Sequence, residues 1–155
     1  MTRADTLRSL EREVGVMIRR VRRLIRERAH SVHPDLQPAS YLLLASIAQS
    51  GPVRASVLVE QFDIDKGAIS RQVTHLVDLG LLASVKDPDD GRATLLSLTD
   101  EAVRRMADVA EHRHRLLDET LSDWTAEELE GFVGELNRYN TALNLGLAQR
   151  TQAAV

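Results

Sequence analysis

The 155-residue chain has the composition of one folded domain with little net charge. Hydrophobic residues make up 43% and charged residues 28%, which excludes a disordered or fibrous chain. Twenty basic and 23 acidic residues give a net charge of −3, which excludes a histone-like protein. The chain has no cysteine, so disulfides, thiolate zinc sites and cysteine nucleophiles are excluded. No apolar run reaches the roughly 20 residues of a bilayer span, and the first residues lack the apolar core of a signal peptide. We therefore expect a cytoplasmic protein without membrane contact.

The positive charge is concentrated near the N-terminus. Residues 1–30 hold nine arginines and four acids, whereas residues 31–100 and 101–155 are each net −4. The six arginines between positions 19 and 28 are distributed around a helix rather than along one side of it. A solvated helix surface is the simplest interpretation of such a run.

The first third of the chain predicts two helices. Apolar residues recur at steps of three and four over residues 5–30, which is the period of one helical stripe. Pro34 ends this helix because it lacks an N–H group and restricts the residue before it. Pro38 suits the first turn of a second, largely apolar helix that continues to about Ser50.

Residues 55–80 have the layout of a helix-turn-helix motif. A short helix is expected over residues 55–62, with Val57, Leu58 and Phe62 facing inward. Asp63 tolerates the left-handed turn conformation, and Asp65 can cap a second helix over residues 66–79. The apolar face of this second helix comprises Ile69, Val73, Leu76 and Val77. Its outer, polar face comprises Lys66, Gly67, Ser70, Arg71, Thr74, His75 and Asp78.

After Gly80 the period changes from that of a helix to that of a strand. Two β-rich runs, 81–86 and 93–98, flank a turn rich in Pro, Asp and Gly, which predicts a hairpin. Two further helices follow, one from about Asp100 to Ser122 and one that begins with a capping box at Thr125. The predicted fold class is therefore mainly α, with a small β-hairpin wing.

A helix-turn-helix with an appended hairpin is a winged helix, whose natural partner is double-stranded DNA. We expect residues 1–155 to form a single domain in which residues 38–99 are the DNA-binding winged helix. The helices over 5–30 and 100–148 present more apolar surface than so small a motif can cover, so we expect them to form a homodimer. The two recognition helices of such a dimer would lie about 34–36 Å apart and recognise a palindromic operator.

Two segments resemble the MarR family of transcriptional regulators. One is the helix-turn-helix over residues 63–82, and the more specific one is the wing, Asp87-Pro-Asp-Asp-Gly-Arg-Ala-Thr-Leu-Leu-Ser-Leu-Thr-Asp100. The resemblance spans nearly the whole chain. It implies an obligate homodimer, usually a repressor, that is released from DNA by a small, often aromatic or phenolic, effector. We expect no cofactor.

The resemblance also implies roles for individual residues. Ser70, Arg71 and Gln72 match contacts of the recognition helix, and Arg92 matches the wing arginine that enters the minor groove. Asp90 matches the acid that orients this arginine. Gly91 departs from the family pattern, because many relatives carry a second basic residue there.

Other candidates follow from position in the predicted elements. Lys66, near the helix start, is expected to meet a phosphate, as are Thr74 and Arg54. Gly67 and His75 complete the predicted DNA-binding set. The resemblance also implies an effector cavity, although residues of these types more often belong to an ordinary core. Its candidate lining residues are His30, Tyr41, Leu44 and Trp124.

Metal binding and catalysis have no support in the sequence. His112 and His114 are two apart on a helix and point to different sides, so they cannot chelate one ion together. Nucleophile elbows, phosphate-binding glycine loops and HExxH motifs are absent. One alternative stays open: a winged helix that binds a protein rather than a specific DNA sequence. Residues 51–100, which are net −3, favour that alternative.

Overall fold

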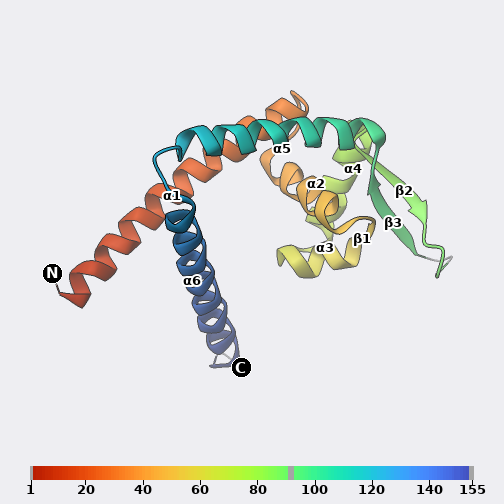
Figure 1. Ribbon diagram of the computed structural model, residues 1–155. Helices are drawn as coiled ribbons and strands as arrows, with labels where there is room; N and C mark the ends of the chain where they lie inside the picture. The colour runs from red at the N-terminus through yellow and green to blue at the C-terminus, as the bar shows by residue number, and fades with distance from the viewer. Residues whose placement is uncertain (1, 91–92, 154–155) are drawn as a thin grey trace. The chain divides into compact units, whose positions relative to one another are not determined.

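The computed structural model describes residues 2–90 and 93–153 and is mainly helical with a small sheet (Figure 1). The predicted fold class is confirmed. The chain forms two compact units, Met1–His112 and Arg113–Val155, whose boundary lies within one helix. The elements of the chain are α1 (Arg3–Val32), α2 (Pro38–Ser50), β1 (Val53–Arg54), α3 (Ala55–Phe62), α4 (Lys66–Asp78), β2 (Leu82–Lys86), β3 (Thr94–Leu98), α5 (Asp100–Thr120) and α6 (Ala126–Ala153).

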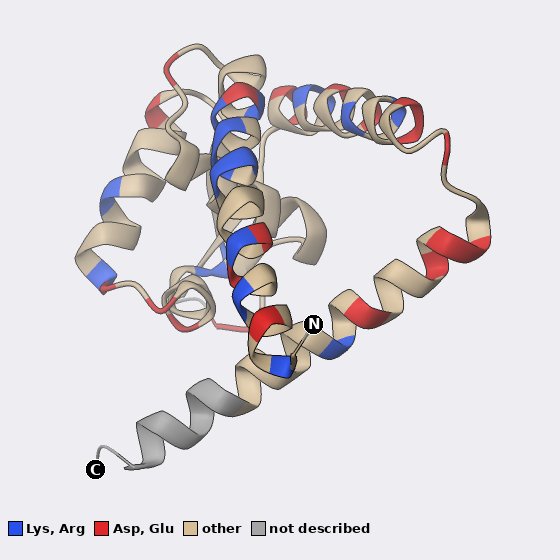
Figure 2. Ribbon diagram, turned by 90° about the vertical axis from the view of Figure 1, so that its left-hand side faces the viewer, with Lys and Arg blue, Asp and Glu red and all other residues tan. Residues whose placement is uncertain are grey.

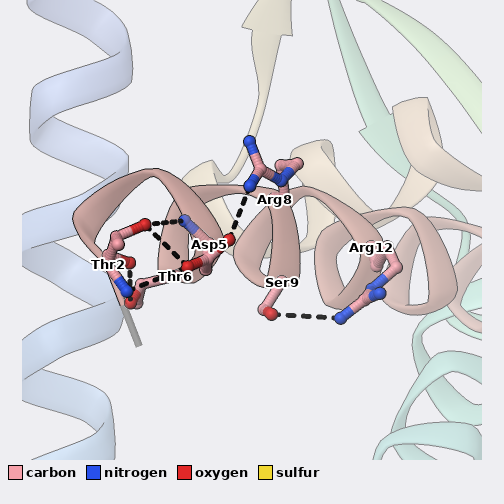
Figure 3. Close-up of polar contacts among 6 residues, drawn as sticks. All are labelled: Thr2, Asp5, Thr6, Arg8, Ser9 and Arg12. Carbon is pink, nitrogen blue, oxygen red and sulfur yellow. Dashed lines mark hydrogen bonds and ion pairs between the residues drawn. The ribbon is translucent and has the colours of Figure 1, made fainter.

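The first helix begins two residues earlier than the apolar period predicts. A capping box at its N-terminus explains the difference: the hydroxyl of Thr2 accepts from the N–H of Asp5, and the Asp5 carboxylate accepts from the N–H of Thr2 (Figure 3). This box satisfies two backbone donors that the first helical turn leaves without partners. The helix ends at Val32, just before Pro34.

The predicted helix-turn-helix is confirmed almost residue by residue. α3 ends at Phe62, and the residue that caps it, Asp63, has a left-handed φ of 50° and ψ of 44°. The Asp65 carboxylate accepts from the N–H of Ala68 at 2.9 Å and caps α4, a contact that typically contributes about 1 kcal/mol. Gly80, with φ of +70°, then turns the chain toward the hairpin.

The wing is a three-stranded antiparallel sheet in the order β1-β3-β2. β2 and β3 form the predicted hairpin, with Leu82 opposite Leu98 and Lys86 opposite Thr94. The sequence does not predict β1, because a strand of two residues has no period to detect. β1 pairs Val53 with Leu96, and it therefore joins the start of α3 to the wing.

The core of the first unit lies between α2, α4 and the wing sheet, and the end of α1 closes it. Two inward-facing predictions are wrong: Val57 and Val77 are 45% and 42% exposed. Each is the sequence neighbour of a fully buried leucine and is rotated from it by about 100° around its helix. Such short helices bury only one narrow line of side chains, and in α3 and α4 that line includes Leu58 and Leu76.

The second unit contains the end of α5 and all of α6. Thr125 and Glu128 form the predicted capping box, with hydrogen bonds of 2.8 and 3.2 Å. Trp124 packs edge-on against Phe132, with ring centroids 5.6 Å apart. Among the helices of residues 2–90 and 93–153, none combines the length and apolarity that crossing a membrane requires.

Candidate nucleic-acid interface

The outer side of α4 is the exposed polar surface that the sequence predicts. Five of its residues, in two adjacent rows with steps of four residues, share this side and are exposed, while Ile69 and Leu76 are buried on the opposite side. Lys66 and Arg71 have no acidic partner within the described part of the chain. The α4 surface, as we call it, comprises Lys66, Gly67, Ser70, Arg71 and Thr74.

Gly67 has a local reason to be glycine. A Cβ atom at this position would lie 3.0 Å from Oδ1 of Asp65 and 3.5 Å from Nη1 of Arg71. The first of these distances is shorter than ordinary van der Waals contact. Glycine therefore leaves room for the capping carboxylate, whereas the Arg71 guanidinium lies at an ordinary contact distance.

Gln72 and His75 lie differently from the α4 surface. Both are half-buried. His75 Nε2–H donates to the backbone oxygen of Asp35 at 3.2 Å, which ties α4 to the connection between α1 and α2. The side-chain oxygen of Gln72 is buried and has no hydrogen-bond partner among the described residues. The structure thus brings five of the predicted recognition-helix residues together and places these two at the edge.

An ion pair holds the base of the wing. Nε and Nη2 of Arg54 donate to Oδ2 of Asp87 at 2.8 and 2.5 Å, and Nη2 also lies 3.8 Å from Oδ2 of Asp90. The Asp87 side chain is only 7% exposed. Its other oxygen accepts from the N–H of Asp89 at 2.9 Å. Arg54, predicted to meet a phosphate, thus links β1 to the first residue after β2.

The hydrogen bonds at the wing base also set its protonation state. The N–H of Asp89 and then the guanidinium of Arg54 hold the pKa of Asp87 below its ordinary value. Asp87 in turn raises the pKa of Arg54. The pair therefore stays charged at neutral pH. No sequence pattern predicts this pair, because its members are 33 residues apart.

The turn of the wing is closed by backbone hydrogen bonds. The N–H of Asp87 donates to the oxygen of Ala93 at 3.0 Å, and the N–H of Ala93 donates to the oxygen of Asp90 at 2.8 Å. Asp90 itself is half-buried. The predicted minor-groove residue, Arg92, lies outside the described residues, as does Gly91.

The four effector candidates lie in different surroundings. Tyr41 and Leu44 belong to the core of the first unit, at 5% and 0% exposure. His30 is exposed, and its Nδ1–H donates to the backbone oxygen of Pro34 at 3.2 Å. Trp124 belongs to the second unit and packs on Phe132.

A groove of about 370 Å³ lies between α3 and α4. Val59, Ile69 and Val73 make it largely apolar, and Lys66 and Ser70 of the α4 surface also line it. The effector candidates are not among its lining residues. Within residues 2–90 and 93–153, no group of three or more His, Asp or Glu side chains is arranged to hold a metal ion.

Comparison with known proteins identifies the family. Residues 35–93 match the sequence profile described as the MarR family. The HTH-type transcriptional regulator YxaD of Bacillus subtilis (strain 168), itself uncharacterized, is 30% identical over 142 residues. The match covers 92% of this chain and 98% of YxaD. The chain belongs to the MarR family of transcriptional regulators.

Two further proteins extend the comparison. The transcriptional repressor MdtR of the same organism is 29% identical over 92 residues, which cover 59% of each chain. A mutant MarR from E. coli complexed with operator DNA has a similar fold, with a TM-score of 0.65 at 22% identity. That match covers 90% of this chain and 99% of MarR. These relatives are transcriptional regulators rather than enzymes.

Replacing Arg54 with Met, or Asp87 with Asn, tests the wing-base ion pair. Either change should lower the free energy of unfolding in urea, and the double variant should lose less than the sum, because each single change leaves one group unpaired. Arg104→Met, which removes an exposed arginine that pairs only within its own helix, should have little effect.

The free energy of unfolding should depend on pH through Asp87. Because its pKa is lowered in the folded protein, the stabilisation is complete above the ordinary value of 3.8 and is lost as pH falls through the lowered one. The wild type and Asp87→Asn should therefore differ at neutral pH and converge in acid. The assigned pair would be contradicted if the effects of the Arg54 and Asp87 substitutions on the free energy of unfolding were strictly additive. It would also be contradicted if the difference between the wild type and Asp87→Asn did not change with pH.

Proposed function

We propose that this MarR-family regulator binds a palindromic operator as a homodimer, with α4 of each copy in the major groove and the wing beside it. The α4 surface supports the proposal most directly. It is exposed, it combines two cations with two hydroxyls, and the rest of the helix is anchored in the core. An α-helix with such a surface fits the width of the major groove.

Each side chain of the α4 surface has a role that suits its chemistry. Arg71 can donate two parallel hydrogen bonds to the O6 and N7 atoms of guanine. Lys66, at the helix start, meets a backbone phosphate, and Ser70 and Thr74 donate to bases or phosphates. Gln72 and His75 support the helix from its edge. In the wing, Arg92 enters the minor groove, where a narrow width concentrates negative potential.

The homodimer follows from apolar surface that a single copy leaves uncovered. Five large apolar residues of α1 are 41–45% exposed, and they share one side of the helix. In the second unit, Phe132 and Val133 are 51% and 62% exposed. Soluble proteins rarely leave rows of large apolar side chains in water, so a second copy is the natural cover. The five residues of α1 are Leu7, Leu10, Met17, Ile18 and Val21.

Repression relieved by a small aromatic effector is the regulatory part of the proposal. The name of MdtR as a repressor supports the first half. The family resemblance supports the second half, with His30, Tyr41, Leu44 and Trp124 as the candidate contacts. The groove between α3 and α4 offers a further place, since a ligand there would touch Lys66 and Ser70 directly.

Arg71→Ala tests the recognition helix. We expect a 10- to 100-fold loss of affinity for the operator, about 1–3 kcal/mol, together with relaxed specificity at one base pair of each half-site. Fluorescence anisotropy with operator variants measures both effects. Arg138→Ala, an exposed arginine of α6, is the control. Equal affinities of the two variants would remove Arg71 from the interface.

Replacing Met17 and Val21 with Glu tests the dimer. Two carboxylates on the apolar side of α1 should separate the copies, because an unpaired charge is costly to bury. Sedimentation equilibrium should show twice the chain mass of 17.3 kDa for the wild type and the single mass for the variant. Arg20→Glu, on another side of α1, should stay dimeric. A wild type that is monomeric at micromolar concentration would contradict the proposal.

A further inference from the structure

A second basic surface runs along α1. Five of its arginines lie within a sector of about 60° of the helix and extend over about 27 Å of its axis. All five are exposed, and basic residues recur along α1 in Figure 2. The six arginines between positions 19 and 28 are distributed around the helix. Because α1 is continuous from Arg3, however, three of them lie on the same side as the earlier Arg8 and Arg12. The arginine stripe comprises Arg8, Arg12, Arg19, Arg23 and Arg26.

The stripe lies on the side of α1 opposite its apolar residues. Val14 and Val21 mark the apolar side, and they are rotated by about 145–170° from the centre of the stripe. A second copy that covers the apolar side would therefore leave the stripe in water.

Much of the charge on the stripe is uncompensated. Arg8 pairs with Asp5 at 2.5 Å, and Arg23 pairs with Glu27 at 2.8 Å, so these two positions are partly neutralised. By contrast, Arg12 donates only to the hydroxyl of Ser9, at 3.0 Å (Figure 3).

The remaining arginines of the stripe are also available to a ligand. Nη1 of Arg19 lies back over Gly15, 3.6 Å from the position that a Cβ would take there. No carboxylate of residues 2–90 or 93–153 forms an ion pair with Arg12, Arg19 or Arg26. These three guanidiniums can therefore bind an external anion.

We propose that the arginine stripe binds the phosphate backbone of duplex DNA without sequence preference. The residue type supports this, because all nine basic residues of positions 1–30 are arginines, whose planar guanidinium donates two hydrogen bonds to one phosphate. The helix has no aromatic residue, whereas single-strand binding and interfacial membrane helices typically rely on such side chains.

The charge of the winged helix adds an independent reason. Residues 51–100 are net −3, which disfavours sequence-independent attraction to DNA. The stripe would provide the attraction that this region lacks. The inference thus rests on the proposed DNA-binding function and adds a second surface to it.

The test compares two triple variants of the full chain. Arg12→Gln/Arg19→Gln/Arg26→Gln removes the three stripe arginines that pair with no carboxylate, and glutamine preserves the helix because its propensity is close to that of arginine. Arg113→Gln/Arg115→Gln/Arg138→Gln makes the same charge change on exposed residues of the second unit. Each protein is titrated with a random-sequence duplex and with the operator, between about 50 and 200 mM salt.

The stripe variant should bind the random duplex 10- to 100-fold more weakly at the low-salt end. Its slope of log affinity against log salt should be shallower by about 2–3 for each copy that contacts the duplex, because each phosphate that is no longer neutralised reduces the slope by about 0.9. The control should keep the slope of the wild type, and the stripe variant should keep its preference for the operator.

Two results would overturn the inference. One is a stripe variant that matches the control on random DNA. The other is a variant that keeps DNA binding but loses binding to phosphatidylserine vesicles, which would make the stripe a membrane surface. Either result leaves the operator proposal intact if the wild type still prefers the operator. A third result is also informative. If the wild type shows no preference for the operator but the stripe variant loses binding to the random duplex, the stripe proposal is supported and the proposal of sequence-specific recognition is refuted.

Discussion

The anchoring of α4 is the constraint on which the rest of the structure depends. Ile69 and Leu76, two turns apart, are at most 1% exposed, and each such buried side chain contributes about 1.5–3 kcal/mol of hydrophobic stabilisation. The helix cannot rotate without exposing them. The opposite side, with Lys66, Ser70 and Arg71, is therefore held outward before any DNA is present. Binding then requires little ordering of this helix, which lowers its entropic cost.

The winged helix contains few basic residues, and these have different roles. Arg54 pairs with the buried carboxylate of Asp87 and fixes the base of the wing rather than facing solvent freely. That leaves Lys66 and Arg71 as the cations of the α4 surface. We infer a division between a specific surface with few charges and a general one on α1, where Arg12, Arg19 and Arg26 supply charge without base recognition. Such a division would keep affinity for random DNA adjustable without altering the contacts that select the operator.

The elements that local chemistry determines are predictable from the sequence. The αL turn at Asp63, the cap at Asp65 and the turn at Gly80 each depend on residues a few positions away, so the helix-turn-helix follows almost to the residue. Contacts between distant residues and very short elements are not predictable in this way. The Arg54–Asp87 pair spans 33 residues and the contact of His75 with the Asp35 backbone spans 40. The strand β1 has only two residues, too few to show a period. Periodicity also does not show how wide the buried side of a short helix is, and Val57 and Val77 therefore proved to be exposed.

The most direct test of the account is selection of bound duplexes from a random DNA pool by the full-length protein. If two copies present their α4 helices about a two-fold axis, the enriched sequences will contain an inverted repeat with half-site centres about one helical turn, or 34–36 Å, apart. Recovery of no common sequence, or of a single unpaired half-site, would contradict the account.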